Sequence, residues 1–77
     1  MYKLICINCE PIVKKSHDEF YREEPGDELE FGKVYTGKGP LVDPYGNINY
    51  EIRELDGMTL CASRFIPAPK RASFQNH

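Results

Sequence analysis

The sequence has no long hydrophobic run, few cysteines and no tryptophan. Its longest uninterrupted apolar stretch is Leu4, Ile5, Cys6 and Ile7, far short of the roughly 20 residues that cross a membrane and shorter than the hydrophobic part of a secretory signal. The 3 cysteines are an odd number, and without a signal peptide we expect reduced thiols rather than a disulfide framework. We therefore expect a cytoplasmic protein with no membrane segment.

The chain is too short for most enzymes. Its 77 residues have a mass of 8.9 kDa, and general scaling relations indicate that about 63% of the surface of such a chain is buried on folding. Little material remains to enclose a water-excluded active site. We expect one non-enzymatic domain over residues 1–69, followed by a flexible C-terminal tail over residues 70–77, where no apolar pattern continues.

Acidic side chains are concentrated in one segment. Residues 18–30 contain seven acidic side chains and one arginine, whereas the flanking segments are weakly basic. This segment repels phosphate, and the sequence pI of about 5.6 is far from that of a basic nucleic-acid domain. Nucleic-acid binding is therefore the alternative function. It would use a basic strip within residues 33–71 that consists of Lys33, Lys38, Arg53, Arg64, Lys70 and Arg71.

Short apolar stretches separated by turn residues predict an all-β fold. Residues 3–7 are apolar and β-branched and predict a buried strand, and the strict alternation over residues 48–52 predicts a strand with one buried face. Asp56-Gly57 between strand-forming residues predicts a tight hairpin that returns through residues 58–62. The remaining predicted pieces are a bent strand over 29–37, a loop over 39–47 and a short edge strand over 65–67.

Residues 8–30 predict a long irregular excursion between the first two strands. Pro11 and Pro25-Gly26 interrupt the segment, and its apolar residues follow no helical period. A short helical turn is an alternative, because Ser16 and Glu19 have the spacing of a capping box.

The inward phase of the predicted strands indicates the core. Phe31, Tyr50 and Phe65 follow this phase, and one shared core is expected for Cys6, Val34, Ile52 and Phe65. A strict two-residue hairpin turn would leave Leu60 on the outer face. We expect a bulge at Gly57 to turn Leu60 inward, because an exposed leucine is unfavourable in so small a protein.

Three short motifs stand at the predicted strand boundaries: Cys6-Ile7-Asn8, Gly32-Lys33-Val34-Tyr35 and Ser63-Arg64-Phe65. Together with the order of the strands they resemble small bacterial and phage proteins built as SH3-like barrels. The resemblance covers residues 3–67 and implies a small five-stranded SH3-like barrel with a long acidic first loop. It implies no particular activity.

The missing tryptophan separates this sequence from the eukaryotic SH3 domains. Those domains look to depend on a tryptophan after the acidic loop for the aromatic groove that holds polyproline ligands. Because the sequence has none, we do not expect polyproline recognition. The acidic loop could still contact basic peptides.

Cys6-x-x-Cys9 is half of a zinc-ribbon signature. Cys61, His17 or His77 could complete four ligands, but the second half of the signature is missing. Residues three apart on a strand also point to opposite faces, unless the chain turns sharply at Asn8. We therefore expect structural thiols, no metal and no cofactor. A redox dithiol is the remaining alternative, although no helix N-terminus that would lower a thiol pKa is predicted after Cys6.

Two further polar motifs have plainer interpretations. The triplet His17-Asp18-Glu19 could serve acid–base chemistry, but it lies in a polar loop with no predicted nucleophile. The stretch Gly37-Lys38-Gly39-Pro40 lacks the spacing of a phosphate-binding loop and predicts a turn.

Aromatic side chains next to turns and in the acidic loop are the candidates for partner binding. Tyr35 and Tyr45 lie next to predicted turns, and Phe20 and Tyr21 project from the acidic loop. These four could edge a shallow groove to which Arg64 adds charge, and Ile66 belongs to the predicted edge strand. Proline has no N–H, so a partner strand could pair along this edge only up to Ile66. We predict a protein-interaction or self-association module, whose partner is an unknown protein or peptide or a second copy in a weak homodimer.

Overall fold

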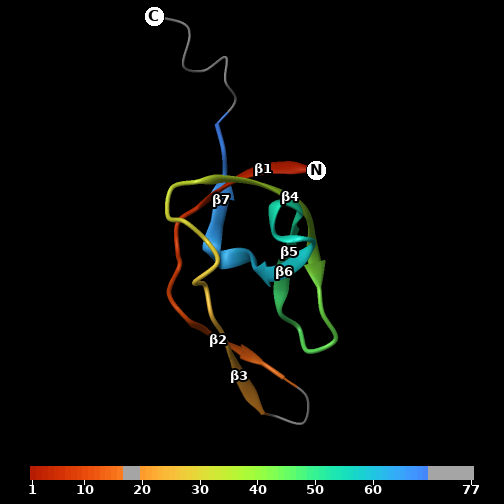
Figure 1. Cartoon of the computed structure of the whole chain (residues 1–77). Coiled ribbons are helices and arrows are strands. Elements are labelled where there is room, and N and C mark those ends of the chain that lie inside the picture. Colours follow the sequence, from red (N-terminus) through yellow and green to blue (C-terminus); the bar gives the residue numbers. More distant parts are fainter. Residues whose placement is uncertain (17–19, 70–77) are drawn as a thin grey trace, which may run out of the picture.

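The computed structural model describes residues 1–16 and 20–69, which form seven β-strands and two short 3₁₀ turns (Figure 1). The elements are β1 (Tyr2–Cys6), β2 (Ile12–Lys15), β3 (Tyr21–Glu24), β4 (Val34–Val42), β5 (Ile48–Ile52), η1 (Arg53–Leu55), β6 (Met58–Cys61), η2 (Ala62–Arg64) and β7 (Phe65–Pro67). The described part contains no α-helix, which confirms the all-β prediction there, and it holds no helix able to cross a membrane. The predicted tail, the helical turn after Ser16 and the His17-Asp18-Glu19 triplet involve residues outside the described ranges.

Five strands form one antiparallel sheet and two form a separate hairpin. The sheet has the order β6-β5-β4-β1-β7, so β4, β5 and β6 follow one another and β7 returns beside β1. The hairpin of β2 and β3 lies at the lower end of the view in Figure 1. Among the described strands no hydrogen-bonded pair joins β6 to β7, so the sheet does not close into a barrel.

The predicted irregular excursion over residues 8–30 is wrong in its middle part, where β2 and β3 form the hairpin. The two strands pair antiparallel along their whole length, and beyond them the Ser16 N–H donates to the Phe20 carbonyl at 2.7 Å. The β-branched pair Ile12 and Val13 favours extended backbone. The charged residues that follow obscured this strand pattern in the sequence.

The predicted bent strand begins at Val34 rather than at Leu29. The intervening residues turn, and Gly32, with φ of +82°, donates its N–H to the Cys6 carbonyl at 2.7 Å. Glycine adopts a positive φ without steric cost. As a result Phe31 lies in a turn and is 75% exposed, so its predicted place in the core is wrong.

The inward phase of β4 is opposite to the prediction. In the register of β1 and β4, Leu4 lies opposite Tyr35 and Ile5 opposite Val34. Directly opposed residues share one face of a sheet. Tyr35 therefore joins Leu4 in the core, and the prediction that Val34 is a core residue is wrong.

The predicted loop at Gly39-Pro40 is instead a bulge inside β4. The register with β5 shifts between Lys38 and Leu41, where Gly39 has φ of +139°, a conformation that favours glycine. The loop between β4 and β5 is therefore short and spans only residues 43–47.

The connection between β5 and β6 is longer than the predicted two-residue turn. η1 is followed by Asp56 at φ of +56° and Gly57 at φ of +76°, and Ile52 then pairs with Met58. This register turns Leu60 to the inner face, where it is buried. The predicted inward position of Leu60 is confirmed, but the 3₁₀ turn produces it rather than a bulge at Gly57 alone.

The core lies on the inner face of the five-stranded sheet. Its buried apolar members are Leu4, Cys6, Leu29, Tyr35, Ile52, Leu60 and Phe65. The predicted members Cys6, Ile52 and Phe65 are confirmed. Phe65 packs edge-on against the rings of Tyr35 and Tyr50, with centroids 6.3 and 6.1 Å away.

Candidate functional site

A buried cluster of polar side chains attaches the β2–β3 hairpin to the five-stranded sheet. Its members are Lys14, Glu24, Asn49 and Arg64, all of them buried. The Glu24 carboxylate accepts hydrogen bonds from Arg64 Nε at 2.6 Å and Lys14 Nζ at 2.9 Å. It also accepts the backbone N–H of Cys61 at 2.9 Å. One carboxylate on β3 thus connects β2, β6 and η2, and we call this set of side chains the Glu24 cluster.

Arg64 extends this cluster to the backbone on both sides of the hairpin. Its Nη1 donates to the carbonyls of Asn8 and Glu10 at 3.1 and 2.7 Å, and its Nη2 donates to the Glu24 carbonyl at 2.6 Å. Arg64 is 0% exposed. The prediction that it supplies charge to a surface groove is therefore corrected, because its guanidinium is used inside the protein.

The Glu24 carboxyl is held in its ionised form. Burial by itself would raise its pKa, but hydrogen bonds from Lys14, Arg64 and the Cys61 N–H keep the pKa below its ordinary value. At neutral pH the cluster then contains two cations and one anion, so Glu24 is the only charge within it that offsets Lys14 and Arg64.

Asp43 fixes the loop between β4 and β5. Its Oδ1 accepts the N–H groups of Tyr45 and Asn47, each at 2.9 Å, and its Oδ2 accepts Asn47 Nδ2 at 2.9 Å. These bonds, foremost the one from the Asn47 side chain, lower the pKa of Asp43. Gly46 completes the turn at a positive φ of +91°.

Asn47 joins this loop to the end of β2. Its Oδ1 accepts the Lys15 N–H at 3.2 Å, and its Nδ2 donates to the Lys15 carbonyl at 2.8 Å. Because Asn47 bonds both to Asp43 and to Lys15, it brings the backbone that carries Tyr45 next to the hairpin.

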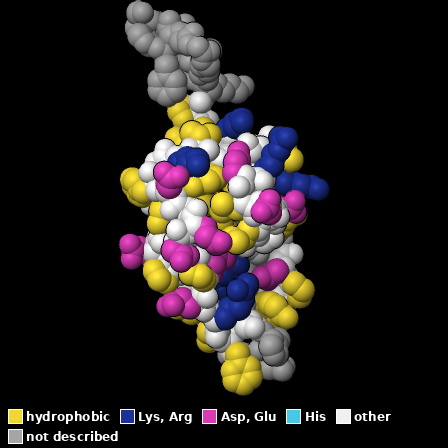
Figure 2. Space-filling view, in the orientation of Figure 1, with side chains coloured by type: hydrophobic (Ala, Val, Ile, Leu, Met, Phe, Trp, Pro, Cys, Tyr) yellow, Lys and Arg dark blue, Asp and Glu magenta, His cyan; other side chains and the backbone are white. Residues whose placement is uncertain are grey.

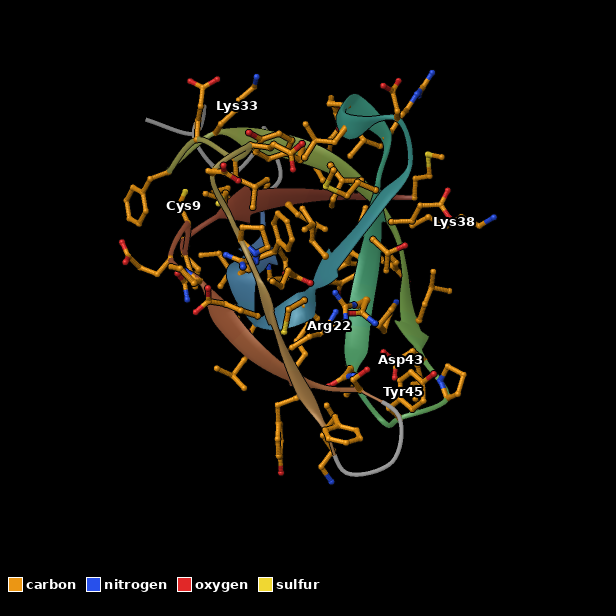
Figure 3. The ribbon with its side chains drawn as sticks, turned by 60° about the horizontal axis from the view of Figure 1, so that its bottom comes forward. Cys9, Arg22, Lys33, Lys38, Asp43 and Tyr45 are labelled. Atoms are coloured by element: carbon orange, nitrogen blue, oxygen red, sulfur yellow. The ribbon has the colours of Figure 1, made fainter. Side chains whose placement is uncertain are left out.

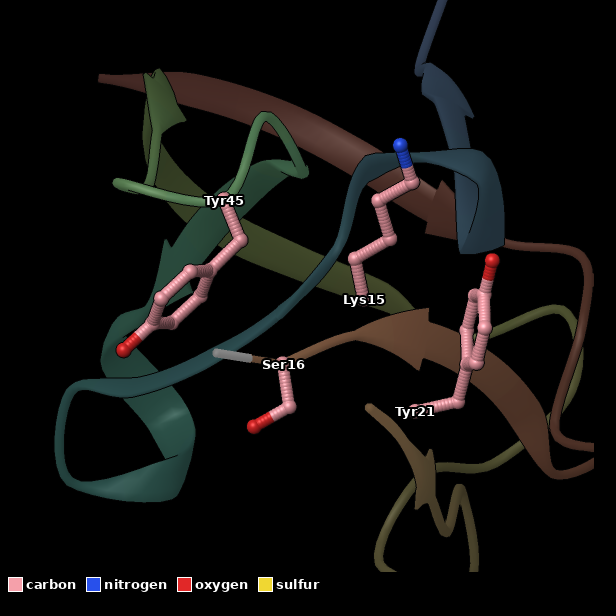
Figure 4. A pocket seen from close by; sticks show the side chains of 4 residues that line it. All are labelled: Lys15, Ser16, Tyr21 and Tyr45. Atoms are coloured by element: carbon pink, nitrogen blue, oxygen red, sulfur yellow. The ribbon is translucent and has the colours of Figure 1, made fainter. Parts of the chain in front are cut away.

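A hollow of about 430 Å³ lies between the hairpin and the 43–47 loop. Its lining consists of Lys15, Ser16, Tyr21 and Tyr45, and Figure 4 shows Lys15 and Ser16 between the two tyrosines. Tyr21 is 65% exposed and Tyr45 is 44% exposed. We call this hollow the tyrosine pocket; its lining combines two aromatic rings, an ammonium group and a hydroxyl.

The structure brings together two of the five predicted site residues, Tyr21 and Tyr45. Tyr35 is buried, and its hydroxyl accepts the Glu30 N–H at 2.9 Å, so it belongs to the core and cannot edge a groove. Ile66 is exposed on β7, outside the tyrosine pocket.

Sequence reasoning missed Lys15 and Ser16. Their link to the 43–47 loop depends on hydrogen bonds between Lys15 and Asn47, which lie 32 positions apart. Turn chemistry identified the loop itself, but no local pattern shows which distant strand end a loop contacts.

A second hollow of about 490 Å³ lies at the turn between β5 and β6, and its lining consists of Glu28, Glu54, Leu55, Asp56, Gly57 and Met58. Thr36 holds Glu54 at this rim, because its N–H and its hydroxyl each donate to the carboxylate at 2.8 Å. The N–H bond in particular lowers the pKa of Glu54. Three carboxylates around one hollow disfavour an anionic ligand there.

The sulfur atoms of Cys6 and Cys9 lie 3.6 Å apart, so the opposite orientation expected for a continuing strand does not occur. β1 ends at Cys6 and the backbone turns after it, which is the condition under which the two thiols can approach each other. Burial and the neighbouring thiol raise the pKa of Cys9. No group of three or more His, Cys, Asp or Glu side chains within residues 1–16 and 20–69 is arranged to hold a metal, and His17 and His77 lie outside those ranges.

Comparison of the chain with protein-family models, with curated proteins and with solved structures gives no match.

Proposed function

We propose that this protein is a non-enzymatic interaction module that binds a segment of another protein at the tyrosine pocket. The observation that carries the proposal is the convergence of Tyr21 and Tyr45 on one hollow from separate parts of the chain. Exposed tyrosines supply large rigid contact areas with a polar end, and they are enriched at protein interfaces for that reason.

The surroundings of the pocket favour an apolar anchor on the partner. Val42 and Ile48 flank the 43–47 loop and are 70% and 51% exposed, and Val13 on the hairpin is 66% exposed. Figure 2 shows hydrophobic side chains at the lower end of the molecule, below the acidic side chains that lie over its middle. The ammonium of Lys15 favours a carboxylate next to the anchor. The proposed ligand is therefore a peptide with an aromatic or aliphatic side chain beside an acidic residue.

For the fold, we propose an SH3-like arrangement in which β6 is joined to its neighbour by side-chain hydrogen bonds where a closed barrel would have a backbone pairing. Support comes from the order of the five-stranded sheet and from η2 directly before the last strand. Where a barrel would continue its pairing from β6, the Cys61 N–H donates to the Glu24 carboxylate instead. Without a tryptophan, the tyrosine pocket takes an apolar anchor rather than polyproline.

Truncation of Tyr45 is expected to weaken peptide binding by about tenfold or more, which is the usual size for a central aromatic contact. Peptides are first selected on the native protein from a phage-displayed library of random linear sequences. Fluorescence anisotropy then measures the Kd of the best peptide for the wild type and for Tyr45→Ala.

The matched control is Phe31→Ala, which removes a 75% exposed ring from a turn outside the pocket. It should leave the Kd within a factor of about two, because isolated exposed side chains contribute little to binding elsewhere. Equal affinities of Tyr45→Ala and wild type would remove the pocket from the proposal.

The nucleic-acid alternative receives less support from the basic residues. Arg64 of the basic strip is buried, and Lys33 forms an ion pair with Glu30 at 3.4 Å. Lys38 lies opposite Glu51 across the strands, and Figure 3 shows Lys33 at the upper left and Lys38 at the right, well apart from each other. Lys70 and Arg71 are outside the described residues. Tight binding of single-stranded DNA at low salt that weakens steeply with added salt would reverse this ranking.

A weak homodimer is the second candidate function, and an apolar row across the outer face of the sheet favours it. Ile5 lies opposite Val34 on one side and opposite Ile66 on the other. Val34 is 47% exposed and Ile66 is 44% exposed. Such a row can pack against its own copy about a two-fold axis.

The outer edge of β7 is less suited to self-association than this face. The Ala68 N–H donates to the Lys3 carbonyl at 2.8 Å, two positions from the Ile66–Ile5 pair. Hydrogen-bonded pairs alternate along an antiparallel ladder, so the Ile66 N–H faces β1 rather than a partner.

The neighbours of Ile66 add no outward donor. The Phe65 N–H donates to the Ala62 carbonyl, and Pro67 has no N–H. Residues 65–67 therefore offer backbone acceptors to a partner strand but no backbone donors. The edge pairing that the sequence predicts would lack N–H groups on this side.

Replacing Ile66 with lysine is expected to abolish homodimerisation, because it places two ammonium groups near the two-fold axis of the apolar row. Sedimentation velocity over a concentration series should show association for the wild type and for the control Val13→Lys, which lies on the hairpin. A wild-type protein that stays monomeric at every accessible concentration would eliminate the homodimer.

A further inference from the structure

We propose that Cys6 and Cys9 form a dithiol site that a small-molecule disulfide converts into an intramolecular disulfide bond. The two Sγ atoms lie 3.6 Å apart in the reduced protein. A disulfide requires about 2.05 Å between the sulfurs, so a movement of about 1.5 Å is sufficient. Rotation of the two side chains can supply a movement of this size.

The backbone around the pair is held independently of the sulfur atoms. Arg64 Nη1 donates to the carbonyls of Asn8 and Glu10, on either side of Cys9. The Cys6 carbonyl accepts the Gly32 N–H at 2.7 Å. These bonds fix the turn that brings the sulfurs together. The native chain therefore pre-organises the pair, which an unfolded chain does not.

The two thiols differ in access, which assigns their roles. Cys6 is 0% exposed in the core, whereas Cys9 is partly exposed and its thiol also contacts the Leu29 carbonyl at 3.6 Å. The attacking thiol must reach the incoming disulfide. Cys9 is therefore the attacking group, and Cys6 is the resolving group.

The exchange balances with one equivalent of disulfide RSSR. The Cys9 thiolate, whose proton goes to solvent, attacks one sulfur of RSSR, the S–S bond breaks, and RS⁻ leaves and takes up a proton. The Cys6 thiol then loses its proton to solvent, and its sulfur attacks Cys9 Sγ in the mixed disulfide and expels the second RS⁻, which takes up a proton. The protein loses two protons and two electrons, and RSSR is reduced to two RSH.

Cys61 provides the internal control. It is partly exposed, but its sulfur contacts the Ser63 hydroxyl at 3.2 Å rather than a second thiol. The variant Cys61→Ser therefore contains only the proposed pair. The variant Cys9→Ser removes the attacking thiol at a partly exposed position and leaves the core cysteine in place.

The test equilibrates the native Cys61→Ser protein with glutathione buffers of stepped ratio, quenches with an alkylating reagent in denaturant, so that the buried Cys6 also reacts if it is reduced, and reads the intact mass. The expected product is the unalkylated intramolecular disulfide. Its equilibrium constant should be about tenfold or more above that of the same protein in urea, because the native fold pre-organises the sulfurs. Cys9→Ser, folded by circular dichroism, should form no intramolecular disulfide at Cys6.

Two outcomes would overturn the proposal. Both are measured at glutathione ratios that oxidise the urea-unfolded chain. In the first, native Cys61→Ser stays reduced and is fully alkylated; in the second, it stops at a glutathione adduct on Cys9. Either result would mean that the fold protects two structural thiols. Equal equilibrium constants in the native and the unfolded protein would contradict the proposed pre-organisation in the same way.

Discussion

Replacing Glu24 with glutamine is expected to lower the free energy of unfolding by about 3 to 5 kcal/mol, the typical cost of removing one partner from a buried ion pair. The substitution keeps the shape of the side chain and removes its charge. Lys14 and Arg64 would then remain buried without the carboxylate that both of them contact at 2.9 Å or less. Urea denaturation of the wild type and the variant measures the difference.

The control for this prediction is Glu23→Gln, which removes the exposed carboxylate next in sequence on the same strand. It should change stability by no more than about 0.5 kcal/mol, as most surface substitutions do. A second variant, Lys14→Met, removes the excess positive charge and should cost less than Glu24→Gln. Equal effects of Glu23→Gln and Glu24→Gln would show that the Glu24 cluster does not hold the hairpin.

The contribution of Glu24 should also depend on pH with a defined sign. Its pKa in the folded protein lies below the ordinary value, so the folded state favours the ionised form more than the unfolded state does. This stabilisation is complete above the unfolded pKa and disappears as the pH falls through the folded pKa. The stability difference between wild type and Glu24→Gln should therefore shrink in acid. A difference that grows as the pH falls would contradict the assignment.

Phe65→Ala is expected to lower the free energy of unfolding by about 3 to 5 kcal/mol, the range for deleting a buried aromatic ring. Phe65 is 6% exposed and packs edge-on against Tyr35 and Tyr50. A small domain has a total stability of about 5 to 15 kcal/mol, so the loss is large. Thermal and urea denaturation both measure it.

The comparison for Phe65 is again Phe31→Ala, whose ring is mostly exposed. Its stability should stay within about 0.5 kcal/mol of the wild type. A Phe65→Ala protein as stable as Phe31→Ala would place the ring of Phe65 outside the core.

The sequence predicted the strands wherever apolar residues gather in short stretches. β1, β5 and β7 were predicted at or near their observed limits, and Leu60 was predicted to face inward. Strand phase was less predictable. A turn stabilised by Gly32 makes β4 begin later than the alternation from Leu29 suggests. As a result Tyr35 lies in the core, where Val34 was predicted, and Val34 lies on the exposed face.

The buried charges could not have been predicted from local patterns. Glu24 lies in an acidic segment whose other described members are exposed, and its partner Arg64 is 40 positions away. A charged residue in such a segment is ordinarily assigned to the surface. The tyrosine pocket was partly predictable, because Tyr45 stands next to a turn and Tyr21 was expected to project from the acidic loop. Their meeting depends on Asn47 and its distant partner Lys15.

The most direct test of the central proposal is to map the contact surface of the selected peptide on isotope-labelled protein by NMR titration. The account predicts that the perturbed amides cluster at residues 13–16, at Tyr21 and in the 43–47 loop, the segments around the tyrosine pocket. It predicts no change at residues 31–34 and 65–67. Perturbations confined to those last segments, with the pocket unaffected, would contradict it.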